Sequence, residues 1–165
     1  MRFWPRTEFQ IYTTQTKDDV LLALKSCTEP GDVLPVRRYI GNKKDYIGNI
    51  AADDFEIMRI SYAFDPNFAY ASIKGTFTIQ DKDTIVNVLM ALHTIVAAVF
   101  VLWLCACAVL FAVFLFSAHG GAFDIKVIVP FFLMIFGYGF IRIGFWYETK
   151  RTKKQLVQTF GGVCA

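Results

Sequence analysis

The hydrophobic pattern of this chain changes near residue 89. Before that point apolar and polar residues alternate or recur at helical spacing, whereas residues 89–116 and 125–147 are almost continuously apolar. Each stretch meets the requirement of roughly 20 apolar residues for a helix that crosses a bilayer, and the first contains no Lys, Arg, Asp or Glu. The pattern predicts a transmembrane hairpin with helices at about 89–117 and 125–147, joined by an external loop at 118–124.

The part before the hairpin, residues 1–88, is predicted to be a small α+β domain with one helix and about five strands. Alternation of apolar and polar residues predicts a mainly antiparallel sheet, with strands at 8–14, 46–50, 55–60, 73–79 and 84–89. Short polar turns join the second strand to the third and the fourth to the fifth, which predicts two β-hairpins.

A helix is expected directly after Thr16, because a Thr side chain can accept a hydrogen bond from the first turn. Asp18 and Asp19 follow at the positive end of the helix dipole. The apolar face of this helix is formed by Val20, Leu21, Leu24 and Cys27, before Pro30 and Gly31.

The connection between the domain and the hairpin is predicted to be short. The β-branched run 84–86 favours strand, so the change from strand to helix is expected between Leu89 and His93. No flexible linker is found there, and the domain should therefore be rigidly coupled to the first membrane helix.

Charge sets the expected orientation. The second apolar stretch leads into a basic tail, residues 148–165, with Lys150, Arg151, Lys153 and Lys154, and these residues should set the topology and meet lipid headgroups. The first residues show no signal peptide, so both termini are expected in the cytoplasm. A net charge of +3 with no basic, aromatic-rich surface argues against nucleic acid as a partner.

No motif for catalysis, metal or cofactor binding is apparent. His93 and His119 lie at opposite ends of the first apolar stretch, and the spacing of Cys105 and Cys107 does not match a redox pair. The protein is therefore expected not to be an enzyme.

Arg142 is the candidate functional residue inside the predicted membrane region. It either extends to the headgroups or lines a pathway or binds a partner. Small residues would let helices approach closely, either within one hairpin or between subunits of a homo-oligomer. They are Cys105, Ala108 and Ala112 on the first helix, and Gly137 and Gly144 on the second.

A resemblance rests on a set of strand, turn and helix-entry segments between about residues 46 and 99. The segments are 46–50, 55–59, an aromatic and proline segment at 62–66, Gly75, and the run 84–88 before Leu92 and His93. Together they resemble a group of uncharacterised two-span bacterial inner-membrane proteins with a β-rich cytosolic N-terminal domain. The resemblance implies a bacterial inner-membrane location and no particular activity.

Two functions fit these expectations. In the first, the cytosolic domain is a non-enzymatic recognition or assembly module that binds a protein or small ligand and is anchored in the lipid bilayer. In the second, several chains assemble into a ligand-gated channel or a membrane-disrupting effector of a toxin or defence type. The first apolar stretch has almost no polar residues between Thr94 and Ser117, which favours anchoring over a permanently hydrated pore.

Overall fold

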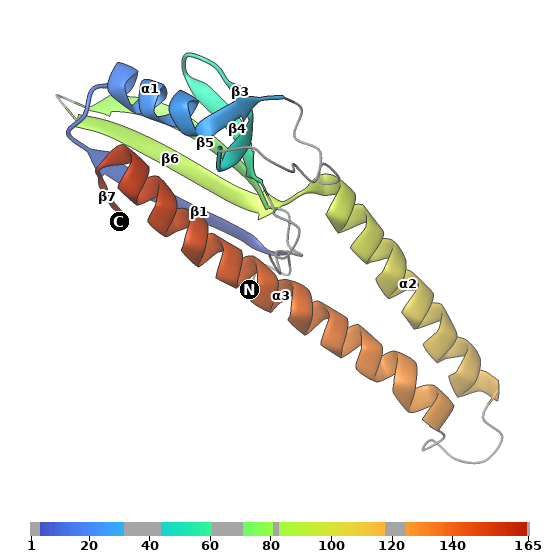
Figure 1. The fold of residues 1–165 in the computed structure, drawn as a ribbon. Helices are drawn as coiled ribbons and strands as arrows, with labels where there is room; N and C mark the ends of the chain where they lie inside the picture. Colours follow the sequence, from blue (N-terminus) through green and yellow to red (C-terminus); the bar gives the residue numbers. More distant parts are fainter. Residues whose placement is uncertain (1–3, 32–43, 61–70, 81–82, 118–124, 165) are drawn as a thin grey trace.

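The computed structural model describes residues 4–31, 44–60, 71–80, 83–117 and 125–164. It has an α+β fold in which a seven-stranded mixed sheet lies at one end of two long apolar helices (Figure 1). These helices are α2 (Thr94–Ser117) and α3 (Ile125–Phe160). Both are long and apolar enough to cross a membrane.

The strands are β1 (Arg6–Thr13), β2 (Thr28–Pro30), β3 (Tyr46–Ile50), β4 (Asp54–Arg59), β5 (Ala71–Gln80), β6 (Asp83–Leu92) and β7 (Val163–Cys164). Their order in the sheet is β2-β3-β4-β5-β6-β1-β7. Neighbouring strands are antiparallel, except β2 and β3, which are parallel. The first and last strands of the chain are therefore neighbours in space.

Strict alternation gives the sheet one apolar face. Every second residue of β6 is buried, from Thr84 to Leu92, and the residues between them are only half-buried. Val86 and Val88 pair with Ile11 and Phe9 of β1, whose side chains are buried on the same face. This face forms the core of the domain.

Helix α1 (Lys17–Cys27) covers part of that face. The side chain of Thr16 accepts a hydrogen bond from the backbone N–H of Asp19, as the sequence predicted. Val20, Leu21 and Leu24 are buried against the sheet domain.

The C-terminal half of α3 lies beside α1 on the same face of the sheet (Figure 1). Its Leu156 and Phe160 are fully buried in the core cluster. The helix ends where Gly161 takes a φ of 56° and Gly162 donates a backbone hydrogen bond to Val157 O, the arrangement of a Schellman motif. One helix of 36 residues thus joins the sheet to the hairpin.

We call α2 together with residues 127–147 of α3 the apolar hairpin. The two helices run antiparallel, with the Trp103 ring against Gly137 and the rings of Phe111 and Phe131 5.9 Å apart. A Cβ atom at Gly137 would lie 2.3 Å from the Trp103 ring, so this close approach requires glycine.

Several boundaries differ from the sequence prediction. Seven strands are present rather than about five, because β2 and β7 are too short to show alternation. The second apolar helix was predicted to end at residue 147, which is wrong: it continues to Phe160, so residues 148–160 are part of the folded domain rather than a tail.

The start of the first apolar helix is also later than residue 89. Strand β6 continues to Leu92, which pairs with Ala71, and His93 alone separates it from α2. This agrees with the predicted change from strand to helix and with the absence of a linker. The predicted loop 118–124, the segment 62–66 and His119 lie outside the described residues.

Candidate functional site

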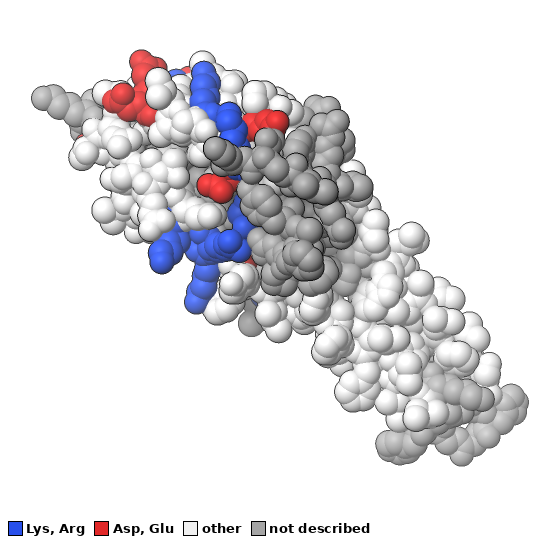
Figure 2. Space-filling model, viewed as in Figure 1, with Lys and Arg blue, Asp and Glu red and all other residues white. Residues whose placement is uncertain are grey.

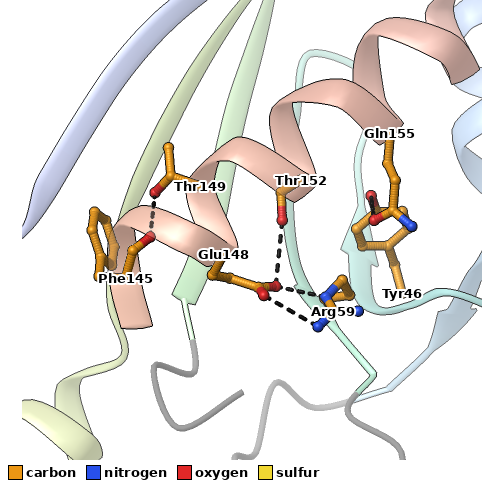
Figure 3. A network of polar contacts seen from close by, with 7 residues as sticks. All are labelled: Tyr46, Arg59, Phe145, Glu148, Thr149, Thr152 and Gln155. Carbon is orange, nitrogen blue, oxygen red and sulfur yellow. Dashed lines mark hydrogen bonds and ion pairs between the residues drawn. The ribbon is translucent and has the colours of Figure 1, made fainter. Parts of the chain in front are cut away.

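The most unusual site in the described residues is a buried ion pair where the sheet meets α3. Arg59, the last residue of β4, donates from Nε to Glu148 Oε1 at 2.6 Å and from Nη2 to Glu148 Oε2 at 3.1 Å. Only 7% of Arg59 and 3% of Glu148 is exposed. Thr152, one turn further along α3, donates its hydroxyl to Glu148 Oε1 at 3.4 Å (Figure 3).

The neighbouring strand adds a second polar contact. Tyr46 of β3 pairs in register with Arg59, and its hydroxyl donates to Gln155 Oε1 of α3 at 3.4 Å (Figure 3). Burial raises the pKa of the Tyr46 phenol well above its usual value, so the group stays neutral. Residues from β3 and β4 therefore contact α3 at two positions seven residues apart, Glu148 and Gln155.

These contacts join α3 to β3 and β4. Both oxygens of the Glu148 carboxylate already accept hydrogen bonds, and the guanidinium of Arg59 is engaged on two of its nitrogens. A buried pair gains little net stability over apolar residues, but one charge left without the other is strongly destabilising. The pair therefore opposes any shift of α3 on the sheet that would separate Glu148 from Arg59.

The apolar core also crosses this junction. Phe145 belongs to the same buried cluster as Ile73 and Met90 of the sheet, and Val96 and Ile141 of the hairpin pack against that cluster. Trp4 extends the contact, with its ring 6.4 Å from that of Phe100 on α2. The sheet domain and the apolar hairpin therefore share one core.

Over β1, β5 and β6 the opposite face of the sheet is polar and open, whereas on β3 and β4 Ile47 and Met58 are buried on this face in a second apolar cluster. Gln10 donates to Asn87 at 2.8 Å, Asn87 donates to Thr78 at 3.2 Å, and Lys74 pairs with Glu56 at 3.1 Å. These side chains alternate with the core positions of β1, β6, β5 and β4. A shallow depression of about 580 Å³ on this face is lined by Glu8, Gln10, Lys74, Thr76 and Asn87, among others.

The residues proposed for helix packing take different positions. Gly137 lies against Trp103, as described above, and Ala112 and Gly144 are half-buried. Cys105 and Ala108 are exposed, whereas Cys107 between them is buried.

Arg142 and the basic residues lie on the surface of α3. Arg142 is exposed and donates from Nη1 to the Tyr138 hydroxyl at 3.3 Å. Lys150, Arg151 and Lys154 are exposed, and Lys153 is half-buried with Nζ 5.3 Å from the centroid of the Phe9 ring. Figure 2 shows Lys and Arg gathered over the C-terminal part of α3, next to the hairpin, whose described residues are white in this view.

Sequence reasoning missed Arg59 and Glu148. They lie 89 residues apart, so no local pattern links them. The available signal was helical spacing: Phe145, Thr152 and Phe160 recur on one face, and the Gly161-Gly162 pair is typical of a helix end.

Within the described residues, no group of three or more His, Cys, Asp or Glu side chains lies close enough to hold a metal ion. Searches with protein-family models, curated proteins and solved structures found no match to this chain.

Proposed function

We propose that this chain is a non-enzymatic integral membrane protein whose β-rich domain is a recognition or assembly module held at the membrane surface. The observation that carries the proposal is the shared core and buried Arg59–Glu148 pair at the junction. A domain attached only for anchoring needs no more than a tether. Here the sheet is fixed to both helices, so its binding face has a defined orientation toward the bilayer.

The open polar face of the sheet is the recognition surface in this proposal. It carries both charges, from Lys74 and Glu56, and amide groups from Gln10 and Asn87. Such groups suit a polar protein or small-ligand partner rather than the bilayer itself.

The proposed location is a bacterial inner membrane with both termini in the cytoplasm. The charge bias supports this orientation, since four basic residues, Lys150, Arg151, Lys153 and Lys154, follow the second apolar segment. The bacterial assignment rests on the sequence resemblance alone.

Anchoring is tested by extracting membranes at alkaline pH and by fusing reporters after Ala165 and at Gly120. The proposal expects the chain to stay in the membrane, with a cytoplasmic reporter after Ala165 and an external one at Gly120. Release of the chain by alkali, or an external C-terminus, would contradict it.

Recognition is tested by measuring the mass of the intact assembly extracted from native membranes. We expect a defined complex, either with a partner or with further copies of the chain. Lys74→Glu on the open face should dissociate it, whereas Lys25→Glu on exposed α1 should not. A bare monomer in the wild type, or equal effects of both substitutions, would argue against a recognition face.

A second function is favoured by one observation, the continuity of α3 from the sheet through the hairpin. A helix of this kind would transmit ligand binding to the membrane, as a gated channel or membrane-disrupting effector requires. Ion flux in cells expressing wild type, Arg142→Lys and Arg142→Leu at matched levels separates the two. The anchoring proposal expects no difference, and a wild-type flux lost in both variants would favour the channel.

A further inference from the structure

Aromatic and basic side chains recur every four residues along one surface ridge of α3 where it leaves the apolar hairpin. Four-residue spacing places side chains next to one another along a helix surface. The ridge consists of Tyr138, Arg142, Trp146, Lys150 and Lys154. We call it the cationic ridge.

Two contacts show that the ridge residues act as pairs. The Arg142 guanidinium carbon lies 5.8 Å from the centroid of the Tyr138 ring, and the Lys150 ammonium lies 3.8 Å from that of Trp146. Trp146 is 58% exposed, and Arg142, Lys150 and Lys154 are exposed as well. Arg142 and Lys150 therefore each rest on an aromatic ring and still present donors outward.

The depth of the ridge follows from the packing of the two helices. Trp103 lies against Gly137, and the helices are antiparallel. Thr94 begins α2 nine residues before Trp103, and Trp146 follows Gly137 by the same nine residues. Trp146 is therefore level with the start of the hairpin, where tryptophan is enriched at membrane interfaces.

At 1.5 Å per residue, Arg142 and Lys150 lie about 6 Å to either side of that level. The headgroup layer of one leaflet is itself roughly 5–7 Å thick. Arg142 thus lies on the hydrocarbon side of the Trp146 level and Lys150 on the water side. The two cations can reach the same headgroup from these two sides, beside the Trp146 ring.

The burial of Glu148 removes the acidic side chain of α3 from the surface that carries the ridge. Glu148 is the single acidic residue in the sequence of α3, and it is turned inward onto Arg59. The exposed charged residues of α3 that the structure describes are consequently all basic. An anionic phosphate near the ridge meets no acidic side chain of α3.

We propose that the cationic ridge is a binding site for the phosphate headgroup of an anionic phospholipid in the leaflet next to the sheet domain. The proposal deepens the membrane anchoring proposed above and rests on it. Arg142 donates to the phosphate from the guanidinium nitrogens that Tyr138 does not use, Lys150 neutralises it, and Trp146 packs on the glycerol region.

The test uses the full chain in detergent micelles that contain equal amounts of phosphatidylglycerol and phosphatidylcholine, with bound lipid counted by native mass spectrometry. Wild type should retain phosphatidylglycerol preferentially. Because one basic residue close to the phosphate contributes about 1 kcal/mol, each ridge charge removed should lower the preference roughly fivefold, and a charge off the ridge should matter less. Arg142→Gln with Lys150→Gln should therefore nearly abolish it.

Arg151→Gln is the matched control, because it removes the same charge one residue away from the ridge. A variant with Arg142→Lys and Lys150→Arg keeps both charges and should keep the preference, which shows that substituted ridges still fold. A wild type without preference, a preference that survives the double Gln variant, or equal losses in the Arg151 variant would overturn the site.

Two further measurements distinguish a lipid ligand from a soluble one and lipid binding from membrane insertion. Inorganic phosphate in excess should not displace the lipid, and displacement would mean that a soluble phosphate compound is the ligand. Alkaline extraction tests insertion separately: a chain that stays in the membrane without lipid preference refutes the ridge alone, whereas a chain that is released refutes the anchoring and the ridge together.

Discussion

The two halves of α3 expose different kinds of side chain on their outer surfaces. In the half that belongs to the apolar hairpin, large apolar side chains point outward, and Phe132 and Phe136 are 63% and 73% exposed. In the half that lies on the sheet, polar Glu148 and Thr152 are buried and basic residues point outward. One continuous helix thus inverts its outer surface, from apolar in the hairpin half to basic in the sheet half, although Leu156 and Phe160 are buried beside Glu148 and Thr152.

This inversion of the outer surface indicates that the two halves of α3 are surrounded by different solvents. Exposed aromatic rings over several turns are unfavourable in water, whereas they match the hydrocarbon of a bilayer. Basic residues on the outer surface of the other half match water or headgroups. The comparison supports the proposed membrane insertion from the structure of one element, and it can be tested by changing each half in turn.

The largest effect is expected at the buried ion pair. Glu148→Leu leaves the Arg59 charge buried without a partner and should lower the free energy of unfolding of the full chain in detergent by about 3–5 kcal/mol. Combining it with Arg59→Met removes both charges and should recover most of the loss. Thermal unfolding of the three variants measures this.

The matched control is the exposed pair of Glu56 and Lys74 on the other face of the sheet. Glu56→Gln should change the free energy of unfolding by less than about 1 kcal/mol. If Glu148→Leu were as mild as Glu56→Gln, the junction would not depend on the ion pair.

The next effect uses the two leucines of α3, one in each half. Leu156 is fully buried, so Leu156→Ala should lower the free energy of unfolding by about 2–5 kcal/mol. Leu133 in the hairpin is 47% exposed, and Leu133→Ala should cost distinctly less because part of its surface already meets the surrounding medium. Thermal unfolding compares them, and equal losses would contradict the inversion.

The two halves of α3 also differ in how well the sequence predicted them. The apolar half was predicted because its composition alone identifies it. The sheet half was read as a tail because its basic run, Lys150 to Lys154, dominates the local pattern. Its buried face mixes Glu148 and Thr152 with Leu156 and Phe160, so apolar periodicity is weak.

In the sheet, the strands long enough to show alternation were predicted, including β1 with its distant partner β6, and the two shortest strands were not. The pairs β3 with β4 and β5 with β6 are hairpins whose alternation is visible over five or more residues. Strand β2 has three residues and β7 has two, and each exists only because a distant strand pairs with it. The Arg59–Glu148 pair escaped prediction for the same reason.

A smaller effect is expected at the glycines of the two halves. Gly161 ends α3 with a φ of 56°, so Gly161→Ala should lower the free energy of unfolding by about 1 kcal/mol. Gly139 lies in the hairpin with nothing within 4 Å of an added Cβ, and Gly139→Ala should stabilise the helix by about 0.5–1 kcal/mol. Opposite signs in thermal unfolding are the expected result, and a loss at both would mean that Gly139 serves a contact.

The smallest effect concerns Tyr46, whose folded-state pKa is raised by burial above the usual value of about 10. The folded state therefore holds the phenol proton more tightly than the unfolded state does, and this contribution to stability is fully present below pH 10. It is lost as the pH rises from 10 through the raised folded pKa. Tyr46→Phe removes the titrating group and one long hydrogen bond to Gln155, so it should cost only about 0.5 kcal/mol at neutral pH but flatten the alkaline loss. Unfolding midpoints measured from pH 8 to pH 11 test this, with Tyr12→Phe on the exposed face as the control. An unchanged alkaline slope in Tyr46→Phe would mean that the contact between β3 and α3 opens before the phenol ionises, and that the sheet half of α3 is less firmly held than its buried ion pair implies.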